Sequence, residues 1–203
     1  MDHAVAIVEA YLQINGYFTV AEYPVIEAKQ GRQFIEATDL DLLAFRFPGA
    51  GRLVTGDGDE HTFAPDPELG IDRDHEDMLI AEVKEGRASL NPAVRDPEVL
   101  RIALARFGCC ESRHAHATAT KLIKTGEAMT PAGHRVRMVV FGSNAKGQGS
   151  AHYTTISMSH VIRYIESYLD EHWEVLHHAQ FKHPALGMMM VRAKALREET
   201  GEP

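Results

Sequence analysis

The sequence predicts one mixed α/β domain, and three observations support this prediction. The chain has 203 residues, of which 44% are hydrophobic and 25% charged, as expected for a globular domain with one good core. Helical and strand-like apolar patterns follow one another in the order helix, three strands, one or two helices and a strand. No internal repeat or low-complexity tract divides residues 1–203, so we expect a single domain.

The first expected element is a helix over residues 2–15. Val5, Val8 and Leu12 are three and four residues apart and therefore lie on one stripe of this helix. Gly16 comes directly after it, and glycine commonly ends helices.

Three strands are expected next, at residues 17–26, 34–47 and 78–84, where the chain is rich in apolar, aromatic or β-branched residues. Residues 48–77 separate the second strand from the third and are rich in Gly, Pro and Asp. We expect this segment to be an acidic excursion from the domain surface.

The second half is expected to contain, in order, helices at 97–107 and 112–124, strands at 135–141 and 153–158, and a long C-terminal helix at 159–178. Ser159 is the expected N-cap of the last helix. Its expected inward-facing residues are Val161, Ile162, Ile165, Leu169 and Trp173. The small polar residues at 143–150 predict a flexible loop.

Two of the expected strands carry charge within apolar runs. Because side chains alternate between the faces of a strand, Asp39 and Asp41 should share one face, and Leu40, Leu42 and Ala44 should share the opposite, apolar face. In the third strand Glu82 and Lys84 should likewise share a face. Burying an ionised group costs several kcal/mol unless it is paired or binds a metal, so two such strands need a joint explanation.

A divalent-metal site explains these charges if the two strands are neighbours in the sheet. Mg²⁺ prefers oxygen ligands, and Asp41, Glu82 and the backbone carbonyl of Val83 could supply them. Lys84 would then face the same space, where it could orient or help deprotonate a water molecule and offset phosphate charge. The alternative is an ion pair on the solvated face of an antiparallel sheet.

Five further charged residues are weaker candidates for this site. Glu9 interrupts the apolar stripe of the first helix, so its carboxylate either reaches solvent or meets a partner inside, with an auxiliary metal ligand as one possibility. Asp39 could support Asp41 from two residues away. Arg87, Arg135 and Arg137 could contact a phosphate backbone or pair with nearby acids.

The order of these elements and acids resembles the PD-(D/E)XK, or restriction-endonuclease-like, nuclease superfamily over residues 2–142. The metal-binding Asp of that family corresponds to Asp41, its (D/E)-x-K motif to Glu82-Val83-Lys84, and the acid of its first helix to Glu9. The resemblance implies an αβββαβ core, with a mixed central sheet flanked by helices and here extended by a C-terminal helix. It also implies hydrolysis of phosphodiester bonds, with DNA as the expected substrate and Mg²⁺ or Mn²⁺ as cofactor.

Composition limits the possible partners. Residues 1–100 contain 8 Lys and Arg against 20 Asp and Glu, which argues against a protein that coats nucleic acid by charge alone. No apolar run has the length of a membrane span and no signal-peptide pattern opens the chain, so we expect a cytoplasmic protein without a membrane partner. The alternative to an active nuclease is a catalytically silent nuclease-fold module that binds nucleic acid or protein. A homodimer is compatible with either function.

Overall fold

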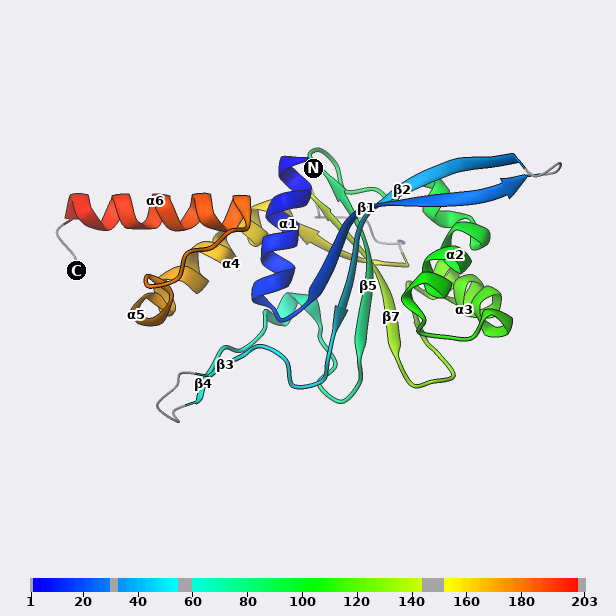
Figure 1. Ribbon diagram of the computed structural model, residues 1–203, viewed down its shortest axis with the longest axis horizontal. Helices are drawn as coiled ribbons and strands as arrows, with labels where there is room; N and C mark the ends of the chain where they lie inside the picture. The colour runs from blue at the N-terminus through cyan, green and yellow to red at the C-terminus, as the bar shows by residue number, and fades with distance from the viewer. Residues whose placement is uncertain (1, 30–32, 55–59, 144–151, 201–203) are drawn as a thin grey trace.

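A mixed six-stranded sheet lies between two layers of helices (Figure 1). This computed structural model of the protein describes residues 2–29, 33–54, 60–143 and 152–200. The strands of the sheet are β1 (Phe18–Lys29), β2 (Gln33–Arg46), β5 (Asp77–Lys84), β6 (Glu127–Met129), β7 (Arg135–Gly142) and β8 (Thr154–Ser157). The helices are α1 (His3–Ile14), α2 (Pro97–Phe107), α3 (Ser112–Thr125), α4 (Met158–Glu171), α5 (Trp173–Leu176) and α6 (Pro184–Thr200). The fold class is therefore mixed α/β, as predicted.

The sheet is built from an antiparallel meander followed by a parallel return. β1 pairs with β2 and β2 with β5, both antiparallel. The chain then passes through α2 and α3 before β7 pairs with β5 in parallel. The short strands β6 and β8 pair with the first and second halves of β7. Two short 3-10 helices, η1 (Pro67–Leu69) and η2 (Pro92–Arg95), precede β5 and α2, and β3 (Arg52–Val54) pairs with β4 (Glu60–Thr62) outside this sheet.

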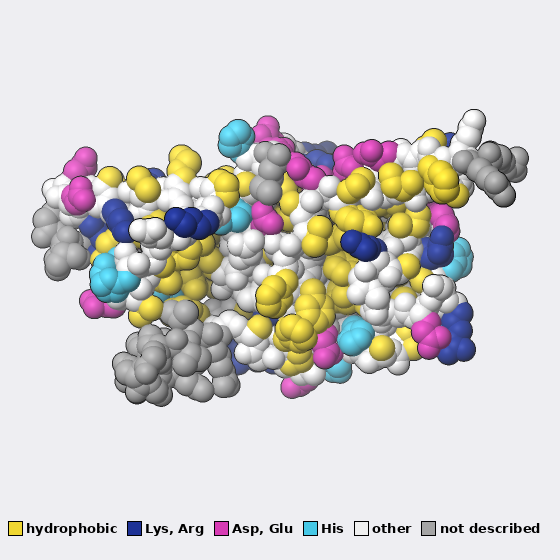
Figure 2. Space-filling view, viewed as in Figure 1, with side chains coloured by type: hydrophobic (Ala, Val, Ile, Leu, Met, Phe, Trp, Pro, Cys, Tyr) yellow, Lys and Arg dark blue, Asp and Glu magenta, His cyan; other side chains and the backbone are white. Residues whose placement is uncertain are grey.

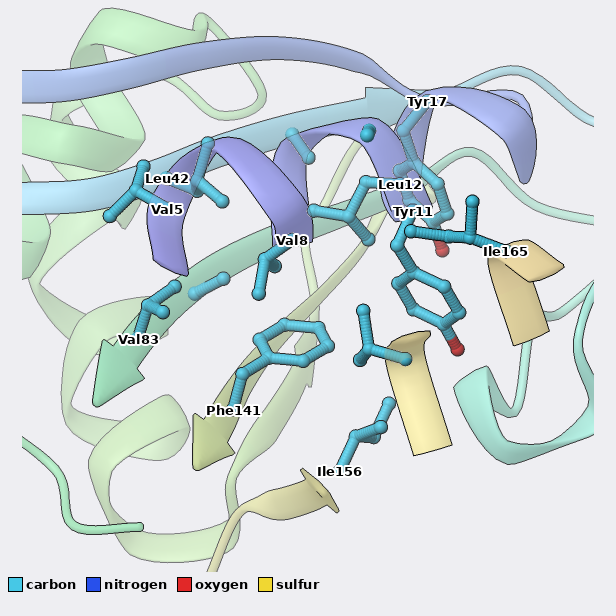
Figure 3. Close-up of a cluster of buried hydrophobic side chains, with 14 of the residues drawn as sticks. Val5, Val8, Tyr11, Leu12, Tyr17, Leu42, Val83, Phe141, Ile156 and Ile165 are labelled. Atoms are coloured by element: carbon cyan, nitrogen blue, oxygen red, sulfur yellow. The ribbon is translucent and has the colours of Figure 1, made fainter. Parts of the chain in front are cut away.

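One hydrophobic core lies between the sheet and the layer of α1, α4 and α6 (Figure 3). The stripe predicted for the first helix is confirmed, because Val5, Val8 and Leu12 are all buried in this core. The Asp2 side chain caps α1 by accepting a hydrogen bond from the Ala4 backbone N–H at 3.1 Å. Gly16 follows the helix with φ +86°, where a Cβ would also crowd the 50–51 backbone, so glycine is required there.

The second core lies between the opposite face of the sheet and helices α2 and α3. Met78 and Ile80 of β5 belong to this core, whereas Leu79, Ala81 and Val83 belong to the α1 side. The predicted alternation along this strand is therefore confirmed, and it places Glu82 and Lys84 on the face that α2 and α3 cover.

The β1–β2 hairpin extends beyond the rest of the sheet (Figure 1) and does not follow simple alternation. Glu22 has a left-handed backbone, with φ +51°, opposite the position of Asp41 in β2. Leu42 lies in the core on the α1 side, but Leu40 lies in the core beneath α2 and α3. The prediction that these leucines share a face was wrong, because the hairpin turns at this irregularity and re-aims the residues beyond it.

Two other segments differ from the sequence-based predictions. Phe63, Asp66 and Leu69 are buried, so part of the acidic segment 48–77 returns to the protein body instead of staying at the surface. The expected single helix at 159–178 is interrupted at His172, and its N-cap is Ser157, whose side chain accepts the His160 N–H at 3.1 Å.

Ile162 of α4, expected to face inward, is 37% exposed. Apart from Ser143, the loop predicted at 143–150 lies outside the described residues. None of the helices in the described ranges is long and apolar enough to cross a membrane.

Candidate active site

The two strands predicted to carry the site are neighbours, and they bring Asp41 and Glu82 together. The β2–β5 ladder runs from the Arg46–Asp77 pair to the Leu42–Ala81 pair, so Asp41 and Glu82 face each other where it ends. There the Asp41 Oδ2 atom accepts the Val83 backbone N–H at 2.7 Å. A carboxylate thus takes the place that a backbone carbonyl would occupy if the ladder continued.

Lys84 lies between these two carboxylates. Its Nζ atom donates a hydrogen bond to Glu82 Oε1 at 2.7 Å and lies 3.7 Å from Asp41 Oδ2. The exposed fractions of the side chains are 4% for Glu82, 23% for Asp41 and 34% for Lys84. Glu82 is therefore buried, and the more exposed Asp41 and Lys84 side chains lie between it and solvent.

The electrostatics of this cluster are unbalanced, because two carboxylates share one ammonium group. Burial raises the pKa of Glu82 to about 7, and the charge of Asp41 adds to this shift while Lys84 opposes it. Burial alone would lower the pKa of Lys84, but its hydrogen bond to Glu82 and the charges of both acids raise it above its ordinary value. Lys84 is therefore protonated at neutral pH, and Glu82 titrates near neutrality.

The turn after Lys84 is packed closely against β7. Gly142 is paired with Lys84 in the parallel register, and a Cβ at this position would lie 2.7 Å from the Ala88 Cα. Because a side chain at residue 142 would displace the backbone of residue 88, the glycine holds the turn of residues 85–88 against the sheet.

The donor set at this site fits Mg²⁺ or Mn²⁺ bound together with a phosphate. Among the described residues, no three or more His, Cys, Asp or Glu side chains are grouped so that they could hold a metal ion. Asp41 and Glu82 form a pair, and Mg²⁺ in enzymes that act on phosphates is commonly held by one or two carboxylates, water and substrate oxygen. The pair does not fit a closed site in which the protein supplies every ligand.

Glu9, the predicted auxiliary ligand, lies on the other side of the sheet from Asp41 and Glu82. Its Oε1 atom accepts the Thr19 hydroxyl at 2.8 Å, and its Oε2 atom is 3.0 Å from His183 Nε2. The carboxylate therefore met a partner inside, and that partner is a histidine close to the N-terminus of α6.

Two other candidates do not join the cluster. Asp39 is exposed on the hairpin, where its hydrogen bond and charge raise the pKa of Glu36. Arg87 is exposed in the turn that follows β5.

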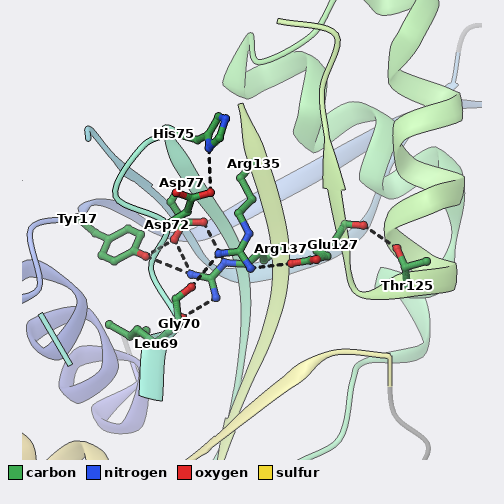
Figure 4. A network of polar contacts seen from close by, with 10 residues as sticks. All are labelled: Tyr17, Leu69, Gly70, Asp72, His75, Asp77, Thr125, Glu127, Arg135 and Arg137. Carbon is green, nitrogen blue, oxygen red and sulfur yellow. Dashed lines mark hydrogen bonds and ion pairs between the residues drawn. The ribbon is translucent and has the colours of Figure 1, made fainter. Parts of the chain in front are cut away.

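Arg135 and Arg137 lie at the opposite end of the sheet and contact protein groups (Figure 4). Arg135 donates to the Gly70 carbonyl and to Glu127 Oε2, both at 2.7 Å. Arg137 is buried and donates from Nε to Asp77 Oδ1 at 2.9 Å, with a second hydrogen bond to the other oxygen of Asp77. These contacts match the alternative that the arginines pair with nearby acids.

The Asp77–Arg137 pair was not predicted from the strand patterns, but the sequence contains a feature from which it could have been. Asp77 opens an apolar strand, and Arg137 lies within a second apolar strand whose remaining residues are almost all buried. A lone charge in either strand would be costly, so each predicts an oppositely charged partner.

A second polar cluster had no such signal. Asp66 is buried, and its Oδ2 atom accepts the Tyr11 hydroxyl at 2.7 Å and lies 2.5 Å from His160 Nε2. The backbone N–H of Asp66 donates to Asn15 Oδ1 at 2.7 Å. A groove of about 630 Å³ adjoins this cluster, which ties α4 to α1 through the segment that we expected at the surface.

Comparison of the chain with protein-family models, with curated proteins and with solved structures gives no match. Any function proposed for this chain therefore rests on its own residues and their geometry.

Proposed function

We propose that the protein is a Mg²⁺- or Mn²⁺-dependent nuclease that hydrolyses phosphodiester bonds, with DNA as its substrate. The observation that carries this proposal is the convergence of Asp41, Glu82 and Lys84 from two neighbouring strands. Two opposed carboxylates with a half-exposed lysine suit phosphate chemistry better than a solvated surface pair, because the acid closest to the lysine is almost fully buried.

The connectivity of the sheet supports a restriction-endonuclease-like core. The order α1, β1, β2, β5, α2 and β7 corresponds to the αβββαβ order that the resemblance implies. In this sheet the antiparallel strands β1, β2 and β5 are followed by the parallel strand β7. The central strands β2 and β5 carry Asp41 and Glu82 close to the same end of the sheet.

In this proposal Asp41 and Glu82 would hold the cation, which would acidify a water molecule and neutralise charge on the scissile phosphate. The Lys84 ammonium moves from between the carboxylates and donates hydrogen bonds to the attacking water or to a phosphate oxygen. Its raised pKa suits this orienting role better than that of a base. The water oxygen would form a bond to phosphorus while the bond from phosphorus to the leaving oxygen breaks, and the proton that the water loses would reach the leaving oxygen through solvent.

The test is a cleavage assay with Mg²⁺ and with Mn²⁺ on single-stranded, duplex, flap and four-way DNA. We expect Lys84→Ala to lower the cleavage rate by about 10²–10⁴-fold, in line with removal of a charge-stabilising or proton-transfer group. Lys182→Ala is the matched control, since Lys182 is an exposed lysine between α5 and α6. No cleavage of any substrate, together with no rise in the thermal midpoint on adding Mn²⁺, would contradict the proposal.

The same contacts favour one alternative, a catalytically silent module in which Lys84 is a permanent counter-ion. Its ammonium group already contacts both acids, as a structural ion pair would. In that case Lys84→Ala would lower the free energy of unfolding by leaving two carboxylates unpaired, and Mn²⁺ would not stabilise the wild-type protein.

A further inference from the structure

Helix α4 and residues 64–67 line a groove of about 630 Å³, which the proposed nuclease site does not use. The residues of α4 that line it recur every three or four positions, so they lie on one face of the helix. On the opposite wall the Ala64 carbonyl accepts the Tyr164 hydroxyl at 3.2 Å, and this hydrogen bond joins the two walls. The groove is therefore built into the fold.

The α4 wall of this groove is aromatic. His160, Tyr164, Tyr168 and His172 follow one another at intervals of four residues. The Tyr164 ring centroid lies 6.4 Å from the centroids of His160 and of Tyr168, and both pairs of rings are stacked. On the face drawn in Figure 2, hydrophobic side chains, among which that figure counts tyrosine, reach the surface where α4 passes between α6 and α5. Because the face of an aromatic ring attracts cations, this wall favours a ligand with positive charge and apolar surface.

Carboxylates lie at both ends of this aromatic row. Near the start of α4, Asp66 Oδ2 lies 2.5 Å from His160 Nε2, and Glu68 Oε1 lies 3.5 Å from His160 Nδ1. Glu171 lines the other end, about 16 Å from His160 along the helix axis. Among the described residues that line the groove, Arg163 is the one Lys or Arg. The three carboxylates therefore outnumber Arg163 and His160 even with His160 protonated.

The acid at the start of α4 is fixed in place. Asp66 is buried, and its carboxylate accepts the Tyr11 hydroxyl at 2.7 Å and the Glu68 backbone N–H at 2.9 Å. The Glu68 carboxylate beside it is exposed and can accept a hydrogen bond from a ligand. Burial raises the pKa of Tyr164 above its usual range, and the charges of Asp66 and Glu171 add to this shift. The acids at both ends of the groove therefore act on the aromatic row.

We propose that this groove binds a linear polyamine. One terminal ammonium group donates to Glu68, beside the charge of Asp66, and the other donates to Glu171. The methylene groups and inner ammonium groups between them lie against the rings of Tyr164 and Tyr168.

The same features disfavour other ligands. A short amine would meet carboxylates at one end only, and the excess of carboxylates repels phosphates and other anions. Among the described residues no three or more His, Cys, Asp or Glu side chains are grouped so that they could hold a metal ion, so an organic cation fits this groove better than a metal.

The test is isothermal titration calorimetry of the full chain with spermine, at low ionic strength and without added divalent metal. We expect one site with a dissociation constant on the order of tens of micromolar. Putrescine, a short diamine, should bind about tenfold more weakly, because it cannot reach the carboxylates at both ends.

Two variants test the two kinds of contact. Glu171→Gln should weaken spermine binding about three- to fivefold, because it removes the carboxylate at one end. Tyr168→Leu should weaken it by a similar factor, because it removes a ring but keeps an apolar side chain. Glu174→Gln is the matched control, since Glu174 is an exposed acid of α5 outside the groove and its replacement should leave binding unchanged.

Four outcomes would each overturn the proposal. They are no heat of binding with spermine at millimolar concentration, equal affinities for spermine and putrescine, equal affinities of Glu171→Gln and Glu174→Gln, and tighter binding of AMP than of spermine. Thermal unfolding checks that the variants fold. Because Glu171 is exposed, its variant tests the proposal even if Tyr168→Leu does not fold. None of these outcomes depends on cleavage activity.

Discussion

Strand β5 carries a charged cluster at each end, and the two clusters differ in how completely they are enclosed. At its start, Asp77 is fully buried and its carboxylate receives hydrogen bonds from Arg137 and Tyr17. At its end, Glu82 is buried but shares one half-exposed lysine with Asp41. The first cluster encloses its one acid with the buried Arg137 and Arg46, whereas the second keeps an excess acid within reach of solvent.

The proposed function depends on this difference between the two clusters. In the first cluster Arg137 pairs with Asp77 and also donates to the Leu69 carbonyl at 2.6 Å, and the buried Arg46 adds a second positive charge near Asp77, so no acid is in excess. In the second, the excess carboxylate favours uptake of a proton or a cation. Substitutions in the two clusters should therefore differ in kind, and the largest change in stability is expected in the enclosed one.

Arg137→Ala should lower the free energy of unfolding by about 3–5 kcal/mol, because it leaves the Asp77 carboxylate buried without its counter-ion. Urea unfolding measures this change. Arg135→Ala is the matched control, and we expect a loss below about 1 kcal/mol because its pair with Glu127 is solvent-accessible. If both variants lost the same free energy of unfolding, the Asp77–Arg137 pair would stabilise the fold no more than a surface ion pair does.

Glu82 should make the stability of the protein fall as pH rises. Its folded-state pKa of about 7 lies above the ordinary value of 4.5, so its contribution is complete below about pH 4.5 and is lost as pH passes through 7. We expect this loss to be on the order of 1–3 kcal/mol.

Urea unfolding between pH 4.5 and 8.5 compares Glu82→Gln with the wild type. The variant should lack this pH dependence, whereas Glu85→Gln, at an exposed acid three residues away, should retain it. A Glu82→Gln protein with the pH dependence of the wild type would place the titrating group elsewhere.

The smallest effect is expected at Glu9. Glu9→Gln retains groups that can hydrogen-bond with Thr19 and His183 but loses the charge, so the free energy of unfolding should fall by less than about 1 kcal/mol. Stabilisation by Mn²⁺ should be unchanged, as measured by thermal unfolding with and without the ion. If the variant lost this stabilisation, Glu9 would act as a metal ligand despite its position on the other side of the sheet.

The sequence by itself was sufficient for the central part of the fold. The helical stripe of Val5, Val8 and Leu12 and the shared face of Glu82 and Lys84 follow from the backbone periods of helices and strands, which need no tertiary information. The mixed α/β class followed from the order of the elements. The pairing of Asp41 with Glu82 needed one added assumption, that their strands are neighbours.

Only the tertiary structure decided which faces and partners these residues have. Periodicity placed Glu9 on an apolar stripe of the first helix, but it could not show that α1 covers the face of the sheet opposite Asp41 and Glu82. It also could not show that His183, 174 residues later in the sequence, contacts Glu9. The left-handed backbone at Glu22 re-aims the hairpin, so alternation failed at Leu40. Periodicity is a local property of the backbone, whereas the choice of face and the long-range contacts arise when the whole chain packs.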